Sequence, residues 1–252
     1  MASVAIIGQD GAGKTTISNM VLERLPYKMK YIYMGRNVDS SNYFLPTSKI
    51  IHLYKIYKYK RKYKIEDNRT AKKLSLHEID QDRKKDTRGK IGAFLRLLNR
   101  LAEEWYRLVI SLSYQKRGYL VIYDRHFIVD SIPDKLDTEI SRKRLTTRIH
   151  DWVLKNLYET PSLIIFLYAP AEVLFARKGE ATIEYIKVKN EAFLKFGESL
   201  RGFEVVDATQ SVEKVFEAVK QKVDNLYKSQ KKNKFILKDT KEELIKDHGI
   251  AE

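Results

Sequence analysis

The chain has 252 residues and no cysteine, with 43% hydrophobic and 32% charged residues. This composition is typical of a folded domain and excludes disulfide frameworks, cysteine nucleophiles, cysteine-ligated zinc and iron–sulfur clusters. The 48 Lys and Arg against 33 Asp and Glu leave a net charge of +15, which favours anionic partners such as nucleotides, nucleic acid or an acidic membrane surface. Neither a signal peptide nor an apolar segment of about 18 residues is evident, so we expect a cytoplasmic protein.

Five short apolar segments alternate with amphipathic helical patterns along the chain. Each apolar segment is almost continuously hydrophobic, which predicts strands that are covered on both faces. The alternation favours an α/β fold, a three-layer sandwich in which a five-stranded parallel sheet has helices on both faces. The strands are expected over 3–7, 31–34, 119–123, 163–167 and 203–206, and the helices over 15–25, 91–116, 142–157, 182–196 and 211–227.

A glycine-rich loop follows the first predicted strand and opens the first predicted helix. Gly8-Gln9-Asp10-Gly11-Ala12-Gly13-Lys14-Thr15 fits the P-loop pattern G-x-x-x-x-G-K-[ST] in its expected strand–helix context. Its glycines let backbone N–H groups surround phosphate oxygens, Lys14 can reach the β- and γ-phosphates of ATP, and the Thr15 hydroxyl can bind Mg²⁺. The sequence therefore predicts a P-loop NTPase sandwich whose nucleotide site comprises Gly8, Asp10, Gly11, Ala12, Gly13, Lys14, Thr15 and Thr16.

The third predicted strand ends in Asp124-Arg125-His126. In a parallel sheet this position lies at the carboxyl edge, beside the phosphate loop. Asp124 could bind Mg²⁺ or accept a proton from the phosphoryl acceptor, and Arg125 could bind an anionic acceptor or the transferring phosphoryl group. The alternative is a structural turn in which Asp124 caps a helix and pairs with Arg125. The neighbouring phosphate loop favours the functional interpretation.

Two regions stand apart in charge. Residues 50–90 contain 14 Lys and Arg and 6 Asp and Glu, and we interpret them as a basic helical insertion or a cap over the acceptor. Within them, tyrosines alternate with cations over residues 53–64. Four interpretations are compatible with this pattern: a nucleic-acid-binding surface, a surface that binds anionic membrane, a surface that guides an anionic substrate, or a solvated helix. We expect one domain over 1–227 and a charged C-terminal extension over 228–252.

These motifs resemble those of thymidylate kinases. The loop at 8–16, the Asp124-Arg125-His126 triplet, the segment Ala176-Arg177-Lys178-Gly179-Glu180 and the segment at 205–215 are all similar to that family. The resemblance implies a nucleoside monophosphate kinase that uses ATP and Mg²⁺. It implies that Lys14, Asp124, Arg125 and Arg177 are catalytic, that Thr15 and Asp124 bind the metal, that residues 177–196 form a lid, and that the protein is a homodimer.

The acceptor side departs from this resemblance. Thymidylate kinases carry Arg-Glu-Pro-Gly after the second strand, where this chain has Gly35-Arg36-Asn37. The family also places an arginine about twenty residues before the Asp-Arg motif, whereas here Arg100 lies 24 residues before Asp124 and Glu104 takes the twenty-residue position. The expected acceptor-binding residues are Arg36, Arg100, Trp105 and Arg125.

Three functions are compatible with these features. The first is transfer of the ATP γ-phosphoryl group to a nucleoside monophosphate, with thymidylate as the acceptor that the resemblance favours. The second is a kinase of a sugar or glycan, which the altered segment after the second strand suggests. The third is an NTP-binding protein associated with nucleic acid or membrane, which the net charge and residues 50–90 suggest.

Overall fold

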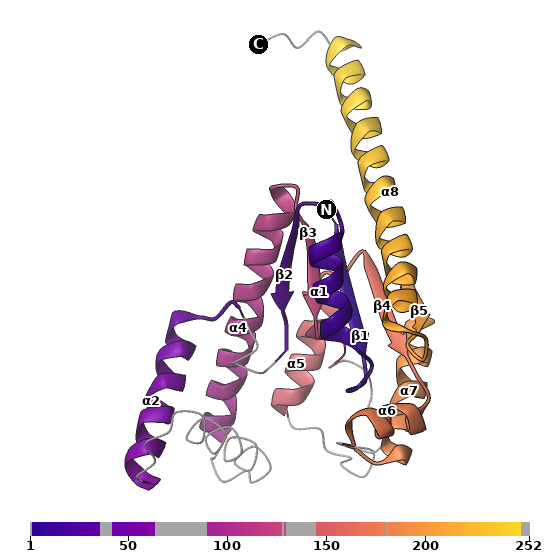
Figure 1. Ribbon diagram of the computed structural model, residues 1–252. Coiled ribbons are helices and arrows are strands. Elements are labelled where there is room, and N and C mark those ends of the chain that lie inside the picture. Colours follow the sequence, from indigo (N-terminus) through magenta and orange to yellow (C-terminus); the bar gives the residue numbers. More distant parts are fainter. Residues whose placement is uncertain are drawn as a thin grey trace.

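The computed structural model describes residues 2–35, 42–63, 90–127, 129, 145–179 and 181–247. Five strands form one parallel sheet with the spatial order β2-β3-β1-β4-β5 (Figure 1). All five lie within two residues of the segments predicted from apolar runs. They are β1 (Ser3–Gly8), β2 (Met29–Tyr33), β3 (Leu120–Asp124), β4 (Leu163–Tyr168) and β5 (Phe203–Asp207).

The strand order decides where the functional motifs meet. β1 lies in the centre of the sheet, between β3 and β4. Its residue Ile6 pairs with Asp124, the last residue of β3. Ligands of open α/β sheets bind beyond the carboxyl ends of the strands, where the chain connections diverge. The phosphate loop after β1 therefore lies directly beside the Asp124-Arg125 motif after β3.

Helices cover both faces of the sheet, so the predicted three-layer sandwich is confirmed. Successive β1 side chains enter opposite clusters, with Ile6 in the cluster under α1 and α8 and Ile7 in the cluster under α4, α5 and α7. In the described residues, no helix is both long enough and apolar enough to cross a bilayer. The helices are α1 (Lys14–Arg24), α2 (Pro46–Tyr63), α4 (Lys90–Lys116), α5 (Leu145–Asn156), α6 (Ala171–Lys178), α7 (Ile183–Gly197) and α8 (Val212–Asp247).

The C-terminal region differs from the expectation of a helix that ends near residue 227. α8 continues without a break to Asp247 (Figure 1), so the expected boundary between domain and extension falls inside one helix. The physical reason is local, because residues 228–247 contain neither glycine nor proline and include seven lysines, which favour helix.

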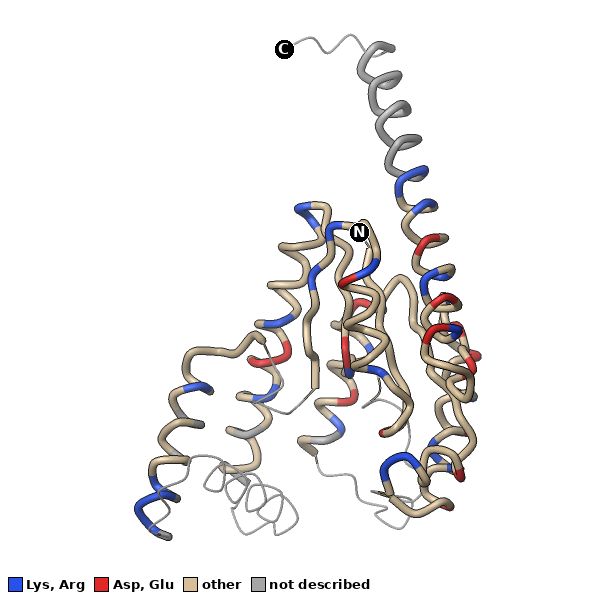
Figure 2. Tube along the Cα trace, in the orientation of Figure 1, with Lys and Arg blue, Asp and Glu red and all other residues tan. Residues whose placement is uncertain are grey.

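The basic region is helical where the structure describes it. α2 covers 46–63, and its Lys and Arg are drawn in blue in Figure 2. Residues 64–89 lie outside the described residues, as does the expected helical segment 142–144. The expectation of a cap over the acceptor site therefore stays a prediction.

Candidate functional site

The phosphate loop joins β1 to α1 in the conformation that its glycines permit. Gly11 and Gly13 have φ angles of 87° and 86°, which side chains of L-residues disfavour. A Cβ on Gly11 would also lie 3.2 Å from the Leu174 carbonyl oxygen of α6. Gly13 caps α1 and accepts from the Ile17 N–H, so the helix N-terminus adds partial positive charge at the loop. Ala12 is buried, whereas Thr15 and Thr16 are exposed.

Lys14 is held by its own loop. Its Nζ donates to the Gln9 carbonyl oxygen at 2.8 Å and lies 3.5 Å from Asp10 Oδ1. The side chain is buried, and burial lowers the pKa of Lys14 below its ordinary value. Across the stretches that the structure describes, Asp10 is the one carboxylate that pairs with the Lys14 ammonium, and the oxygens of a bound phosphate would add further negative charge around it.

Asp10 links the two functional motifs. Its Oδ1 accepts from Arg125 Nη2 at 2.7 Å and also faces Lys14. Burial acts to raise the pKa of Asp10, but the charges of Lys14 and Arg125 outweigh it and the pKa is lowered. Arg125 has a φ of 55°, a left-handed conformation that is costly for a residue with a Cβ. The turn after β3 therefore directs this guanidinium to the phosphate loop.

Asp124 points into the same site. The residue is 2% exposed, and its Oδ2 accepts from the Tyr31 hydroxyl at 2.9 Å and from the Thr15 hydroxyl at 3.4 Å. Burial and the Asp124 charge raise the pKa of Tyr31, so its hydroxyl stays a donor. The other carboxylate oxygen, Oδ1, is buried without a hydrogen-bond partner in the described part of the chain. A buried carboxylate oxygen in this state can accept a cation or a water molecule.

The Thr15 and Asp124 side chains fit the coordination chemistry of Mg²⁺. They supply a hydroxyl and a carboxylate, which are hard oxygen donors, and the orphaned Oδ1 leaves a coordination position open. Within the described ranges there is no cluster of three or more His, Cys, Asp or Glu that could hold a metal ion alone.

Arg177 lies at the C-terminal end of α6, against the phosphate loop. Its Nη1 donates to the Ala208 carbonyl oxygen at 3.0 Å and to the Gly11 carbonyl oxygen at 3.4 Å. The structure thus brings the four predicted catalytic residues to one edge of the sheet: Lys14 at the start of α1, Asp124 at the end of β3, Arg125 directly after it and Arg177 on α6. Within the expected lid, residues 183–197 form α7, whose Phe193 stacks on Phe166 of β4 at 4.9 Å between ring centroids. The lid expected over 177–196 stays a prediction.

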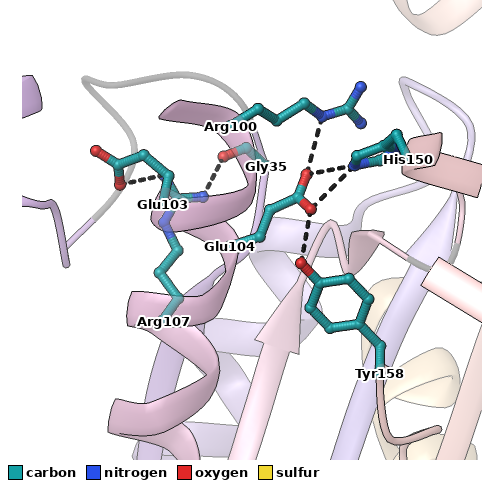
Figure 3. Close-up of polar contacts among 7 residues, drawn as sticks. All are labelled: Gly35, Arg100, Glu103, Glu104, Arg107, His150 and Tyr158. Carbon is teal, nitrogen blue, oxygen red and sulfur yellow. Dashed lines mark hydrogen bonds and ion pairs between the residues drawn. The ribbon is translucent and has the colours of Figure 1, made fainter. Parts of the chain in front are cut away.

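A cluster of polar side chains connects α4 to α5 and to the segment after α5 (Figure 3). It consists of Glu104, Arg100, His150 and Tyr158. Glu104 accepts from Arg100 Nε at 2.9 Å and from the Tyr158 hydroxyl at 2.9 Å, and both carboxylate oxygens lie 3.0 Å from His150 Nε2. Burial acts to raise the pKa of Glu104, but His150 and Arg100 outweigh it and lower the pKa. The expected acceptor ligand Arg100 is thus bound to Glu104.

Sequence reasoning missed this cluster. The one signal was the carboxylate at residue 104, where the resemblance would place an arginine. No spacing rule pairs residue 104 with residues 150 and 158, because the contact depends on how α4 packs against α5. Trp105, the next residue on α4, is 50% exposed, and its assignment to the acceptor stays a prediction.

The buried arginine Arg107 was not given a role in the site by sequence reasoning. Arg107 of α4 donates to the Gly35 carbonyl oxygen at 2.8 Å (Figure 3). It also donates to the Tyr43 carbonyl oxygen at 3.3 Å. Its neighbour Glu103 lies 3.6 Å from the same guanidinium and accepts from the Leu45 N–H at 3.4 Å. These contacts fasten both ends of the segment after β2. Arg36, the predicted acceptor ligand in that segment, lies outside the described residues.

The comparisons with known proteins bear on the fold. No protein-family profile matches the chain, and no curated protein matches it. Among solved structures, the deoxyadenosine kinase from M. mycoides with bound dATP aligns with a TM-score of 0.51 and 19% identity, covering 89% of this chain and 100% of that chain. The same enzyme with dCMP and a flexible dCDP gives a TM-score of 0.46 and 17% identity, covering 89% and 99%. The alignment with the dATP complex supports a P-loop kinase fold for this chain.

Proposed function

We propose that the protein is an ATP-dependent phosphotransferase whose acceptor is a nucleoside monophosphate or a nucleoside, with thymidylate the first acceptor to test. The observation that carries this proposal is the meeting of three groups at the carboxyl edge of the sheet. These are Lys14 in the phosphate loop, Asp124 beside Thr15, and Arg125 within 2.7 Å of Asp10. Cations and a carboxylate around a phosphate loop suit the transfer of a phosphoryl group.

In the proposed reaction, an acceptor oxygen attacks the γ-phosphorus of ATP, and the bond from that phosphorus to the β–γ bridging oxygen breaks to release ADP. Lys14 would move from the Gln9 carbonyl oxygen to the phosphate oxygens, because a phosphate carries more negative charge than a neutral carbonyl. Thr15 and Asp124 would hold Mg²⁺, which supplies charge neutralisation on the phosphates. Arg125 would bind the acceptor phosphate or the transferring group, and Arg177 would neutralise charge from the opposite side.

Two observations bear on the acceptor. Glu104 already contacts Arg100, His150 and Tyr158, so a carboxylate with three partners occupies the α4 position where the resemblance to thymidylate kinases places an arginine. The likeness to a deoxyadenosine kinase adds deoxyribonucleosides as a second acceptor class. In a nucleoside the attacking oxygen is a hydroxyl, and Asp124 would then accept its proton as the alternative to binding Mg²⁺.

The test is a panel of acceptors in the presence of ATP and Mg²⁺. ADP release is measured, and the phosphorylated product is identified by mass, for nucleoside monophosphates, deoxyribonucleosides and simple sugars. We expect one nucleotide or nucleoside to stimulate ADP release with an equal amount of phosphorylated product. Stimulation by sugars alone would move the acceptor to glycans, and ADP formed only with free phosphate would reject phosphoryl transfer to an acceptor.

Two variants separate the roles within the site. Lys14→Met should abolish turnover with every acceptor, because it removes the cation that neutralises the β- and γ-phosphates. Arg125→Ala should raise the acceptor KM or stop transfer while ATP binding, followed by fluorescence of a nucleotide analogue, persists. An Arg125→Ala protein with an unchanged acceptor KM and kcat would show that the acceptor binds elsewhere.

A further inference from the structure

α2 is a cationic helix without any acidic residue. Its 18 residues contain Lys49, Lys55, Lys58, Lys60, Arg61 and Lys62, and neither Asp nor Glu. Figure 2 shows the blue positions of Lys and Arg along it and no red ones. Surface helices of soluble domains usually intersperse both signs of charge, which keeps the local potential low. α2 instead presents a concentrated positive potential to its surroundings.

The same helix exposes an apolar stripe. Ile50, Leu53, Tyr54 and Tyr57 follow the i, i+3, i+4, i+7 spacing of one helix face, and they are 66%, 56%, 64% and 61% exposed. A helix that packs on a domain normally buries such a face. Among the residues that the structure describes, neither core cluster includes a residue of α2. The stripe is therefore a surface with no partner within the described part of the chain.

The placement of α2 makes this stripe accessible. α4 lies between α2 and the sheet, and α2 forms the outer edge of the molecule (Figure 1). Its start is fastened to α4, because Ser48 Oγ donates to Asn99 Oδ1 at 3.4 Å and the preceding Leu45 N–H donates to Glu103. The helix is thus fixed at one end to the domain, while its exposed face is turned to the surroundings.

We propose that α2 binds the surface of an anionic lipid bilayer, with Ile50, Leu53, Tyr54 and Tyr57 inserted at the boundary of headgroups and acyl chains. At about 100° per residue, Lys58 lies on one side of the stripe and Lys60 on the other. An apolar face flanked by cations is the pattern of helices that lie in the membrane interface. The cations would meet anionic headgroups while the tyrosines occupy the interfacial depth that aromatic residues favour.

The chemistry of the stripe favours a bilayer over nucleic acid. Single-stranded nucleic acid is held by aromatic stacking and by cations at the phosphates, and the aliphatic side chains of Ile50 and Leu53 serve neither purpose. Both belong to the exposed face, together with the two tyrosines. A lipid interface would remove all four side chains from water, and it would use the cations on both flanks.

This inference is independent of the proposed phosphoryl transfer, because none of its residues belongs to the nucleotide site. The full chain is tested by co-sedimentation with vesicles of phosphatidylcholine alone and of phosphatidylcholine with phosphatidylglycerol. We expect binding to the anionic vesicles, little binding to the neutral ones, and weakening by salt. Lys14→Met should bind vesicles as the wild type does, although its phosphoryl transfer should be lost.

Matched variants separate local recognition from net charge. Each cation near an anionic surface contributes about fivefold to the partition coefficient. Lys58→Gln with Arg61→Gln should therefore weaken binding about 25-fold, whereas Lys214→Gln with Lys228→Gln on α8, which removes the same charge from exposed positions, should change it less than twofold. Leu53→Ser with Tyr57→Ser should also weaken binding, and its control is Val205→Ser on β5, another exposed apolar position.

Three results would overturn the proposal. Equal losses in the α2 and α8 charge variants would show that net charge alone attracts the protein. Unchanged binding of the Leu53→Ser, Tyr57→Ser protein would show that the stripe does not insert. Failure to bind anionic vesicles, combined with binding of a single-stranded oligonucleotide that the α2 variants abolish, would assign the face to nucleic acid. Matching thermal unfolding curves for all variants establish that each comparison concerns folded protein.

Discussion

Replacement of Glu104 by alanine tests whether the cluster of Glu104, Arg100, His150 and Tyr158 stabilises the packing of α4 on α5. The carboxylate is buried and receives contacts from all three partners, so its removal leaves buried donors without an acceptor. Arg100, which is 30% exposed, can turn to water, whereas His150, at 4%, cannot. Breaking a buried charge network of this kind costs about 3–5 kcal/mol. For a chain of this length that corresponds to a Tm lower by roughly 6–20 °C.

The assay is thermal unfolding followed by circular dichroism near neutral pH. The control is Glu213→Ala, because Glu213 makes a solvent-exposed ion pair with Arg24 and its loss should leave the Tm almost unchanged. Glu104→Gln should fall between the wild type and Glu104→Ala, since an amide oxygen can still accept from one donor while the charge is lost.

The pH dependence supplies a second check. The folded-state pKa of Glu104 is lowered, so its contribution to stability is fully present above the ordinary carboxyl pKa of about 4.3 and is lost as the pH falls through the lowered folded value. The difference in Tm between the wild type and Glu104→Ala should therefore narrow under acid. A difference of less than about 2 °C at neutral pH, or one that widens below about pH 4, would refute the reasoning.

Three further predictions follow from the site and the surface. Gly11→Ala should weaken ATP binding in a nucleotide titration, because φ is 87° there and an added Cβ would lie 3.2 Å from the Leu174 oxygen; unchanged affinity would contradict the strained loop. Tyr31→Phe removes a hydrogen bond to a buried carboxylate and should lower kcat about tenfold with little change in the KM for ATP. We expect a homodimer, and we propose that the exposed apolar residues of α4, including Phe94, Leu98 and Val109, form its self-association face. Leu98→Glu should therefore convert the dimer to monomers in sedimentation analysis, and a monomeric wild-type protein would exclude this face.

Local patterns were sufficient for the sheet and for the centre of the site. The strands were predictable because strands covered on both faces are continuously apolar, and the phosphate loop was predictable because few side chains permit its backbone path. The proximity of Asp124 and Arg125 to that loop also followed from sequence, since carboxyl ends of parallel strands share one edge of a sheet. In the structure, Arg125 Nη2 lies 2.7 Å from Asp10 Oδ1 of the loop.

Contacts between elements far apart in the chain were decided only by the tertiary structure. Glu104 meets His150 and Tyr158 because α4 packs beside α5, and Arg107 fastens the segment after β2 because α4 also runs beside β2. Periodicity identifies one face of a helix as apolar without showing which neighbour covers it. Thus the sequence determined which residues could hold a nucleotide, whereas the packing of α4 and the outward placement of α2 determined which polar groups are buried and which apolar ones remain exposed.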